Sequence, residues 1–306
     1  MPSVSIVITT HNRQREVLRA IRSAAGQTLP ALEIIVVDDA SSPGLNGIEV
    51  AAQSLSPVQL IRHERAHGPA GARNAGIRAA RGDWVAFLDD DDQFAPEKLA
   101  RSMAALEQNP DAAVLHHAAY IDMVNEHVGY ATRLEPHDGG AGLYRRLLVK
   151  NIVGGTPMVL VRREVLTSMG GFDETLPALE DYDLWLRLAG AGYRFIALPE
   201  PLTRCDYVTA RKSVTKSEAA GADTFARILA RHADARAALT SSERLEQRRC
   251  VAETEVHRAI LRLDRRDTVA RTWALWRLQP TLRATLAFVA AAALGPRAMI
   301  RLRARR

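Results

Sequence analysis

The stretch Trp84-Val85-Ala86-Phe87-Leu88-Asp89-Asp90-Asp91-Asp92 places an apolar run directly before four carboxylates. Such a run is typical of a strand buried on both faces, so the acidic block would stand at the carboxyl end of that strand. Repulsion between four adjacent anions is costly unless a cation or water neutralises them, and carboxylate oxygens are preferred ligands of hard divalent cations. The stretch therefore predicts a divalent-cation site. A solvated acidic turn before a helix starting near Pro96 is the alternative.

Upstream of this stretch, apolar runs alternate with segments of helical periodicity. Strands are expected at Val4–Thr10, Glu33–Val37 and Val58–Arg62, and helices at Arg15–Gln27, Val50–Leu55 and Gly71–Ala80. Buried strands that alternate with helices predict an α/β fold with a Rossmann-like, mostly parallel sheet flanked by helices.

Polar residues follow three of these strands. Thr9-Thr10-His11-Asn12-Arg13 closes the first, Asp38-Asp39 the second, and Asp89 to Asp92 the last. Because ligands of parallel α/β sheets bind beyond the carboxyl ends of the strands, we expect these residues to meet in one crevice. Asp38 could serve either that site or the end of its strand.

Residues 93 to about 206 have a mixed pattern. Helices are expected at Pro96–Gln108, Leu143–Lys150, Arg163–Met169 and Glu180–Ala189, and strands at Ala113–Leu115, Pro157–Val161 and Tyr193–Leu198. His116 and His117 are expected in the core or in the wall of an acceptor pocket, and Trp185 in the core.

The last third of the chain is basic and helical in propensity. Residues 207–306 carry 21 Lys and Arg against 9 Asp and Glu, a net of +12, whereas residues 1–206 have a net of −6. Because aromatic residues are few in this third, an anionic membrane surface is a better partner than a nucleic acid. Ala284–Leu294 is apolar but too short to span a bilayer, which favours a helix lying in the interface. A packed terminal helix with a solvated basic tail is the alternative.

The N-terminus and the two cysteines indicate the compartment. Met1-Pro2-Ser3 runs directly into the first strand and does not resemble a signal peptide, and Cys205 and Cys250 do not suggest a disulfide framework. We therefore expect a cytoplasmic protein, peripheral on the inner face of the cell membrane.

The predicted crevice lacks two common nucleotide-binding motifs. Neither a Gly-x-Gly-x-x-Gly turn nor the Gly-Lys-Ser/Thr of a P-loop follows the first strand. Dinucleotide binding and ATP hydrolysis by those routes are therefore disfavoured, and a carboxylate pair holding a divalent ion against a diphosphate remains.

Six motifs in order resemble family 2 glycosyltransferases of the GT-A-type fold, over residues 4 to about 215. They are Val4 to Arg13, Ile35 to Ser41, Gly71-Ala72-Arg73-Asn74-Ala75-Gly76, Phe87 to Asp92, Gly170-Gly171-Phe172-Asp173-Glu174, and Glu180-Asp181-Tyr182-Asp183-Leu184-Trp185. The resemblance implies a GT-A domain at 1–215, with a nucleotide-binding half at 1–92 and an acceptor half at 93–215. A basic helical region would follow at 216–306.

The resemblance also implies roles for single residues. Donor-binding residues would be Thr9, Arg13, Asp39, Arg73, Asp89 and Asp90. Asp91 would bind Mn²⁺ or Mg²⁺ at the donor diphosphate. Asp181 would be the catalytic base, which accepts the proton of the acceptor hydroxyl. Glu180 would orient the pocket or acceptor, and Arg211 would lie in an acceptor or diphosphate-covering loop.

The resemblance implies an inverting, metal-dependent transfer of a single sugar from a nucleoside-diphosphate sugar, by default a UDP-sugar. The acceptor would be a glycan or lipid-linked glycan, in the synthesis of cell-surface polysaccharide or glycoconjugate. The Gln-x-x-Arg-Trp pattern of processive members is absent from the sequence. A nucleotidyltransferase that makes nucleotide sugars, or a degenerate sugar-binding scaffold, are the alternatives.

Overall fold

The computed structural model describes residues 3–47, 57–210 and 222–304. In these residues one mixed sheet has the order β3-β2-β1-β4-β8-β6-β9-β5, and β7 pairs with β6. The strands are β1 (Val4–Thr10), β2 (Glu33–Asp38), β3 (Val58–Arg62), β4 (Trp84–Asp89), β5 (Asp92–Phe94), β6 (Ala112–Met123), β7 (Val128–Ala131), β8 (Val159–Arg162) and β9 (Arg194–Tyr207). The expected helix at Val50–Leu55 lies outside the described residues.

Strands β3, β2, β1 and β4 run parallel, as the apolar runs predict. In the register of this half, Thr9 lies opposite Asp89, and Thr10 lies opposite Asp38. The carboxyl ends of three strands therefore meet at one edge of the sheet, and the polar residues that follow them are neighbours in space.

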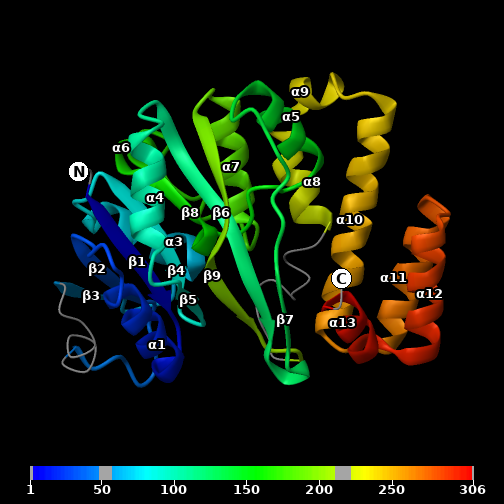
Figure 1. The fold of residues 1–306 in the computed structure, drawn as a ribbon, viewed down its shortest axis with the longest axis horizontal. Helices are drawn as coiled ribbons and strands as arrows, with labels where there is room; N and C mark the ends of the chain where they lie inside the picture. Colours follow the sequence, from blue (N-terminus) through cyan, green and yellow to red (C-terminus); the bar gives the residue numbers. More distant parts are fainter. Residues whose placement is uncertain (1–2, 48–56, 211–221, 305–306) are drawn as a thin grey trace.

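Helices cover both faces of this parallel half (Figure 1). On one face α1 (Gln14–Ala25) and α4 (Lys98–Glu107) pack against alternate strand residues such as Ile6 and Ile34. On the other face, α3 (Gly68–Ala79), α5 (Ala141–Val149), α6 (Arg163–Ser168) and α7 (Glu180–Gly190) share a second core. The strands are buried on both faces, which explains their continuous apolar runs.

Two strands of the second half are longer than the sequence pattern predicts, although the end of β6 falls within Tyr120–Leu134, where an irregular or strand segment is expected. Strand β6 extends beyond Ala113–Leu115, and β9 continues beyond Leu198 to Tyr207, parallel to β6. Pro199 and Pro201 lie inside β9 and remove ladder donors, so the sequence pattern predicts a strand that ends at Leu198. The ladder accommodates Pro201 through register shifts on both sides of its partner Ala118.

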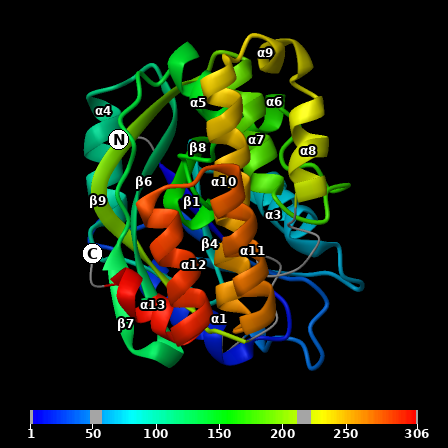
Figure 2. The same cartoon turned by 90° about the vertical axis from the view of Figure 1, so that its right-hand side faces the viewer.

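Helices follow the sheet to the end of the described chain. They are α8 (Ala222–Ala230), α9 (Ala233–Ala237), α10 (Ser241–Leu261), α11 (Arg265–Leu278), α12 (Leu282–Leu294) and α13 (Pro296–Ala304). Figure 2 shows α10 to α13 gathered beside β6, β7 and β9. Val256 of α10 and Ile300 of α13 share a third core with Ile121 of β6. None of the described helices has the length and hydropathy needed to cross a bilayer.

Candidate active site

The acidic block lies at the predicted edge of the sheet, and its carboxylates differ in exposure. The side chains of Asp89 and Asp91 are 33% and 28% exposed, whereas that of Asp90 is 7% exposed. Arg13, directly before α1, places Nη1 at 2.8 Å from Asp90 Oδ1 and 2.5 Å from Asp91 Oδ2. One guanidinium therefore compensates part of the repulsion within the block.

The buried Asp90 positions its neighbours. The hydroxyl of Thr10 donates to Asp90 Oδ2 at 2.7 Å, and Arg13 binds the other oxygen. Burial raises the pKa of Asp90 to about 6, although Arg13 opposes the shift. Both oxygens of Asp90 are occupied, so this residue fixes Arg13 and Thr10 at the edge, while direct contact with a donor stays a prediction. Thr10 itself was not among the predicted site residues, although it lies within the quoted strand-end motif.

The edge has the donors that a divalent cation requires. Asp89 and Asp91 are accessible carboxylates, and a guanidinium already occupies a position between Asp90 and Asp91. Within the described part of the chain, no three His, Cys, Asp or Glu side chains converge on a metal site of their own. Mg²⁺ is usually bound by one or two protein carboxylates, and a bound diphosphate supplies further ligands. The residues therefore fit Mn²⁺ or Mg²⁺ bound together with a diphosphate.

Arg73 connects this edge to the start of α7. Its Nη2 lies 2.8 Å from Asp89 Oδ1, and its Nη1 lies 2.6 Å from Glu180 Oε1. Burial alone would lower the pKa of Arg73, but Asp89 and Glu180 outweigh it and raise that pKa. A buried guanidinium bound by two carboxylates is held in one orientation.

Asp181 lies next to this network, at the first turn of α7. Its Oδ1 accepts the backbone N–H of Tyr182 at 2.7 Å. Its Oδ2 lies beside Gly155, where a Cβ added to the glycine would be 3.8 Å from this oxygen. Burial and the carboxylate of Glu180 raise the pKa of Asp181 to about 7, against the charge of Arg73. A carboxylate with a pKa near neutrality has the property that a general base needs.

The Gly71 to Gly76 motif positions Arg73 by packing its helix closely on the sheet. A Cβ on Gly76 would lie 2.3 Å from Val7 Cγ1 of β1, so only glycine allows this approach. One residue after Arg73, Asn74 Nδ2 donates to the Phe172 carbonyl, and Asn74 Oδ1 accepts the Phe172 N–H. The Asn74 side-chain amide therefore joins the Gly71 to Gly76 motif to the Gly170 to Glu174 motif, which is distant in sequence.

The two aspartates after β2 take separate roles. Asp38 is buried and accepts the backbone N–H groups of Ser41 and Leu45, which makes it a strand-end cap. Asp39 accepts the backbone N–H groups of His67 and Gly68, where α3 begins. Asp39 thus anchors the entry to the helix that carries Arg73, and its expected contact with the donor stays a prediction.

The remaining predicted residues are placed as follows. Thr9 is partly exposed at the end of β1, opposite Asp89. Arg211 lies outside the described residues. His116 and His117 are fully buried within β6, and Trp185 is fully buried and donates to the Gly154 carbonyl. These three side chains belong to the core, as expected for Trp185.

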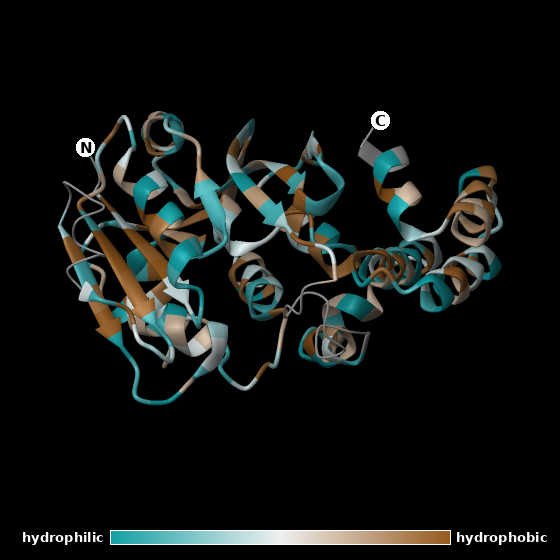
Figure 3. Cartoon of the chain, turned by 90° about the horizontal axis from the view of Figure 1, so that it is seen from below, coloured by the Kyte–Doolittle hydropathy of each residue, from teal (hydrophilic) through white to brown (hydrophobic). Residues whose placement is uncertain are grey.

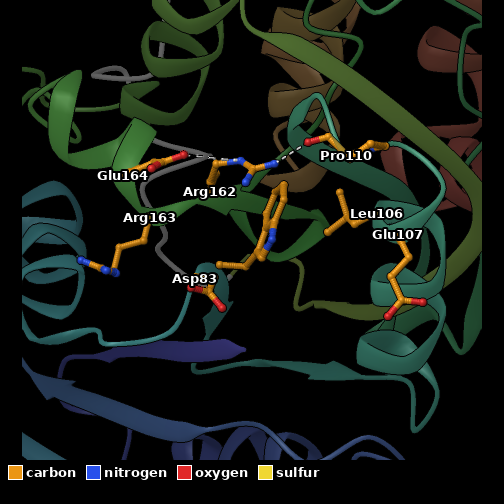
Figure 4. Close-up of a pocket in the computed structure, with 8 residues that line it drawn as sticks. Asp83, Leu106, Glu107, Pro110, Arg162, Arg163 and Glu164 are labelled. Carbon is orange, nitrogen blue, oxygen red and sulfur yellow. Dashed lines mark hydrogen bonds and ion pairs between the residues drawn. The ribbon is translucent and has the colours of Figure 1, made fainter. Parts of the chain in front are cut away.

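An open pocket of about 350 Å³ lies at the opposite edge of the sheet (Figure 4). Asp83 and Trp84 at the amino end of β4, and Arg162 at the end of β8, are among its lining residues. Because none of the strand-end carboxylates lines it, this pocket is separate from the candidate active site.

Comparisons with known proteins bear on both sequence and fold. Residues 5–170 match the family described as Glycosyl transferase family 2. A protein of Haemophilus influenzae named an uncharacterized glycosyltransferase is 39% identical over 215 residues, covering 69% of this chain and 71% of that protein. The amylovoran biosynthesis glycosyltransferase AmsB of Erwinia amylovora is 28% identical over 229 residues, covering 71% of this chain and 73% of AmsB.

A solved structure supports the architecture. The mannosyltransferase PcManGT of Pyrobaculum calidifontis, in complex with GDP-Man and Mn²⁺, has a TM-score of 0.56 at 21% identity. The match covers 96% of this chain and 80% of that one. The expected GT-A-type sheet flanked by helices, with helices at the C-terminal end, is confirmed.

Proposed function

The chain belongs to glycosyl transferase family 2, and on this premise we propose that it moves a single sugar from a nucleoside-diphosphate sugar to an acceptor hydroxyl, with inversion. The observation that carries the proposal is the pair of ion pairs from Arg73 to Asp89 and to Glu180. These ion pairs hold Asp89, at the carboxyl end of β4, near Glu180 and its neighbour Asp181. The carboxylates at that strand end are suited to a diphosphate with its metal. The proposed donor site would thus lie next to the proposed base, Asp181, whose pKa is raised to about 7.

In the proposed reaction the acceptor oxygen loses its proton to the Asp181 carboxylate and attacks the anomeric carbon of the donor. The bond from that carbon to the diphosphate oxygen breaks, and the nucleoside diphosphate leaves with the bonding electrons. Because one displacement occurs on the face opposite the leaving group, the anomeric configuration inverts. Bound at Asp91, Mn²⁺ or Mg²⁺ would supply stabilisation of the charge on the departing diphosphate.

The arginines of the site would act on the same charge. Arg13 and Arg73 are held at the edge by Asp90 and Asp89, so their orientation is fixed before a donor binds. Guanidinium groups that are already oriented stabilise developing charge without further reorganisation. The solved mannosyltransferase binds GDP-Man with Mn²⁺, which supports a nucleotide sugar and a divalent ion here.

The proposed acceptor is a glycan or lipid-linked glycan in cell-surface polysaccharide or glycoconjugate synthesis. The relative AmsB is named for amylovoran biosynthesis, which supports this class. The C-terminal net charge of +12 would hold the enzyme peripherally on the cytoplasmic membrane face.

Thermal unfolding with UDP-, GDP- and dTDP-sugars, each with Mn²⁺, tests the donor. A donor that binds the native state raises its stability by a concentration-dependent amount. We expect one nucleotide class to raise the melting temperature and to release nucleoside diphosphate slowly in water. A protein that no nucleotide sugar stabilises, and that releases no nucleoside diphosphate with any acceptor tried, would contradict the proposal.

A further inference from the structure

The outward face of α12 is apolar. Leu282, Leu286, Val289 and Leu294 are 77%, 54%, 53% and 60% exposed, and the first three follow helical spacing on one side. Together with Trp273 of α11 they are five of the eight exposed large apolar side chains in the described chain. We call these five residues the apolar face. Clustering of this kind marks an interaction surface, whereas single exposed apolar residues do not.

The helix that carries the apolar face is firmly attached. Ala284 and Ala291 on its inner side are buried, and the ring of Phe288 lies 5.3 Å from that of Trp273. Trp276 of α11 donates to the Thr285 hydroxyl at 3.0 Å. The inner side of α12 therefore already has its partner in α11, whereas the four α12 residues of the apolar face remain exposed. In Figures 1 and 3, α12 lies at the end of the molecule opposite the parallel strands.

The sequence from the middle of α11 through α12 and α13 carries charge of one sign. Residues 268–306 contain eight arginines and no Asp or Glu. Arg277 and Arg283 are exposed near the start of α12, and Arg297 is exposed beyond its end. Two copies meeting through this face would bring these like charges together, which is unfavourable. An anionic lipid surface complements them.

The dimensions of α12 decide how it would meet a bilayer. Thirteen residues extend about 20 Å, less than the roughly 30 Å of a hydrocarbon core, so the helix cannot span it. We propose that α12 lies in the plane of an anionic membrane with the apolar face in the acyl boundary and the flanking arginines on lipid phosphates. This inference rests on the membrane location in the proposed function and names the surface that makes it.

The test is co-sedimentation of the full chain with vesicles of phosphatidylcholine alone and with phosphatidylglycerol added. Truncation would remove Ile300 from the third core, so single substitutions are preferable. Leu286→Glu puts a carboxylate on the apolar face, and Leu32→Glu, at a leucine 41% exposed on the other side of the molecule, is the matched control. We expect Leu286→Glu to weaken binding to anionic vesicles about tenfold or more, and Leu32→Glu to leave it unchanged.

Each outcome has one meaning. Salt-sensitive binding to anionic vesicles that Leu286→Glu weakens supports the inference. Equal binding of both variants, or none by the wild type, overturns it, as does a wild-type dimer that Leu286→Glu dissociates without any vesicle binding. Donor hydrolysis measured without vesicles separates the two proposals. Hydrolysis without membrane binding removes only the inference, and membrane binding with no turnover of any donor removes only the proposed function.

Discussion

Arg73 and Glu180 form an ion pair at 2.6 Å that joins α3, at the edge of the parallel strands, to the first turn of α7. The same arginine holds Asp89, so the donor edge and the proposed base are linked through one buried side chain. The geometry between the two halves of the site therefore depends on an electrostatic contact within the core.

We expect Glu180→Gln to lower the free energy of unfolding by about 2 kcal/mol, because it removes one charged partner of a buried arginine that retains Asp89. Chemical denaturation measures this loss. The control is Glu200→Gln, which breaks the exposed pair with Arg101 and should cost less than about 1 kcal/mol. Similar losses in both variants would mean that burial does not strengthen the Arg73 contact.

Asp91→Asn should abolish Mn²⁺-dependent donor binding, because an amide lacks the charge that a hard cation prefers. Titration calorimetry with Mn²⁺ and a nucleotide sugar measures the binding, and circular dichroism checks the fold. Asp111→Asn removes an exposed carboxylate paired with Arg194 and should bind as the wild type does. Unchanged binding by Asp91→Asn would exclude this residue as a ligand.

The rate should rise with pH through about 7, because Asp181 can accept a proton only when ionised and its pKa is raised to about 7. One unit below that pKa, kcat/KM should fall about tenfold. Glu180→Gln removes a nearby negative charge and should therefore shift the rise in rate to lower pH. A profile without such a limb would argue against Asp181 as the base.

Asp181→Asn should retain donor affinity while kcat falls by about 10² to 10⁴. Donor titration and single-turnover kinetics distinguish the two effects. Parallel loss of donor affinity and folded protein would instead make Asp181 a structural residue of the α7 terminus.

Gly170 and Gly171 offer a matched pair for the loop that Asn74 holds. Both have positive φ, +73° and +69°, but a Cβ on Gly171 would lie 2.4 Å from Asn74 Oδ1 and one on Gly170 meets nothing within 4 Å. We expect Gly170→Ala to lower the free energy of unfolding by about 1 kcal/mol through backbone strain alone. Gly171→Ala should lower it clearly more, because its Cβ would also clash with Asn74. Equal losses in thermal unfolding would show that the Asn74 contact relaxes freely.

The parallel half of the fold could be predicted from sequence because each apolar run ends in polar residues. Val4–Thr10 and Val58–Arg62 agree residue for residue with β1 and β3. The length of β9 could not be predicted, because Pro199 and Pro201 normally end a strand and only pairing with β6 shows that it continues.

The candidate site was predictable in its residue types but not in its connections. The strand-end motif indicated Asp89 and Asp91, and the resemblance of the Glu180 to Trp185 motif indicated Asp181. The contact from Arg73 to Glu180, however, spans 107 positions and has no local signal. Two further contacts depend on tertiary packing in the same way. Asn74 joins two motifs through Phe172, and Thr10 binds Asp90.

Arg13 and Arg73 compensate part of the charge of the acidic edge within the protein itself, and this has a consequence for the protein in the cell. Because Asp89, Asp90 and Asp91 already have cationic partners in the folded chain, we expect the protein to fold without an ion. With the metal dependence proposed above, metal starvation should therefore stop activity without exposing the protein to degradation. Folded protein would remain and could catalyse the proposed sugar transfer again when the ion returns.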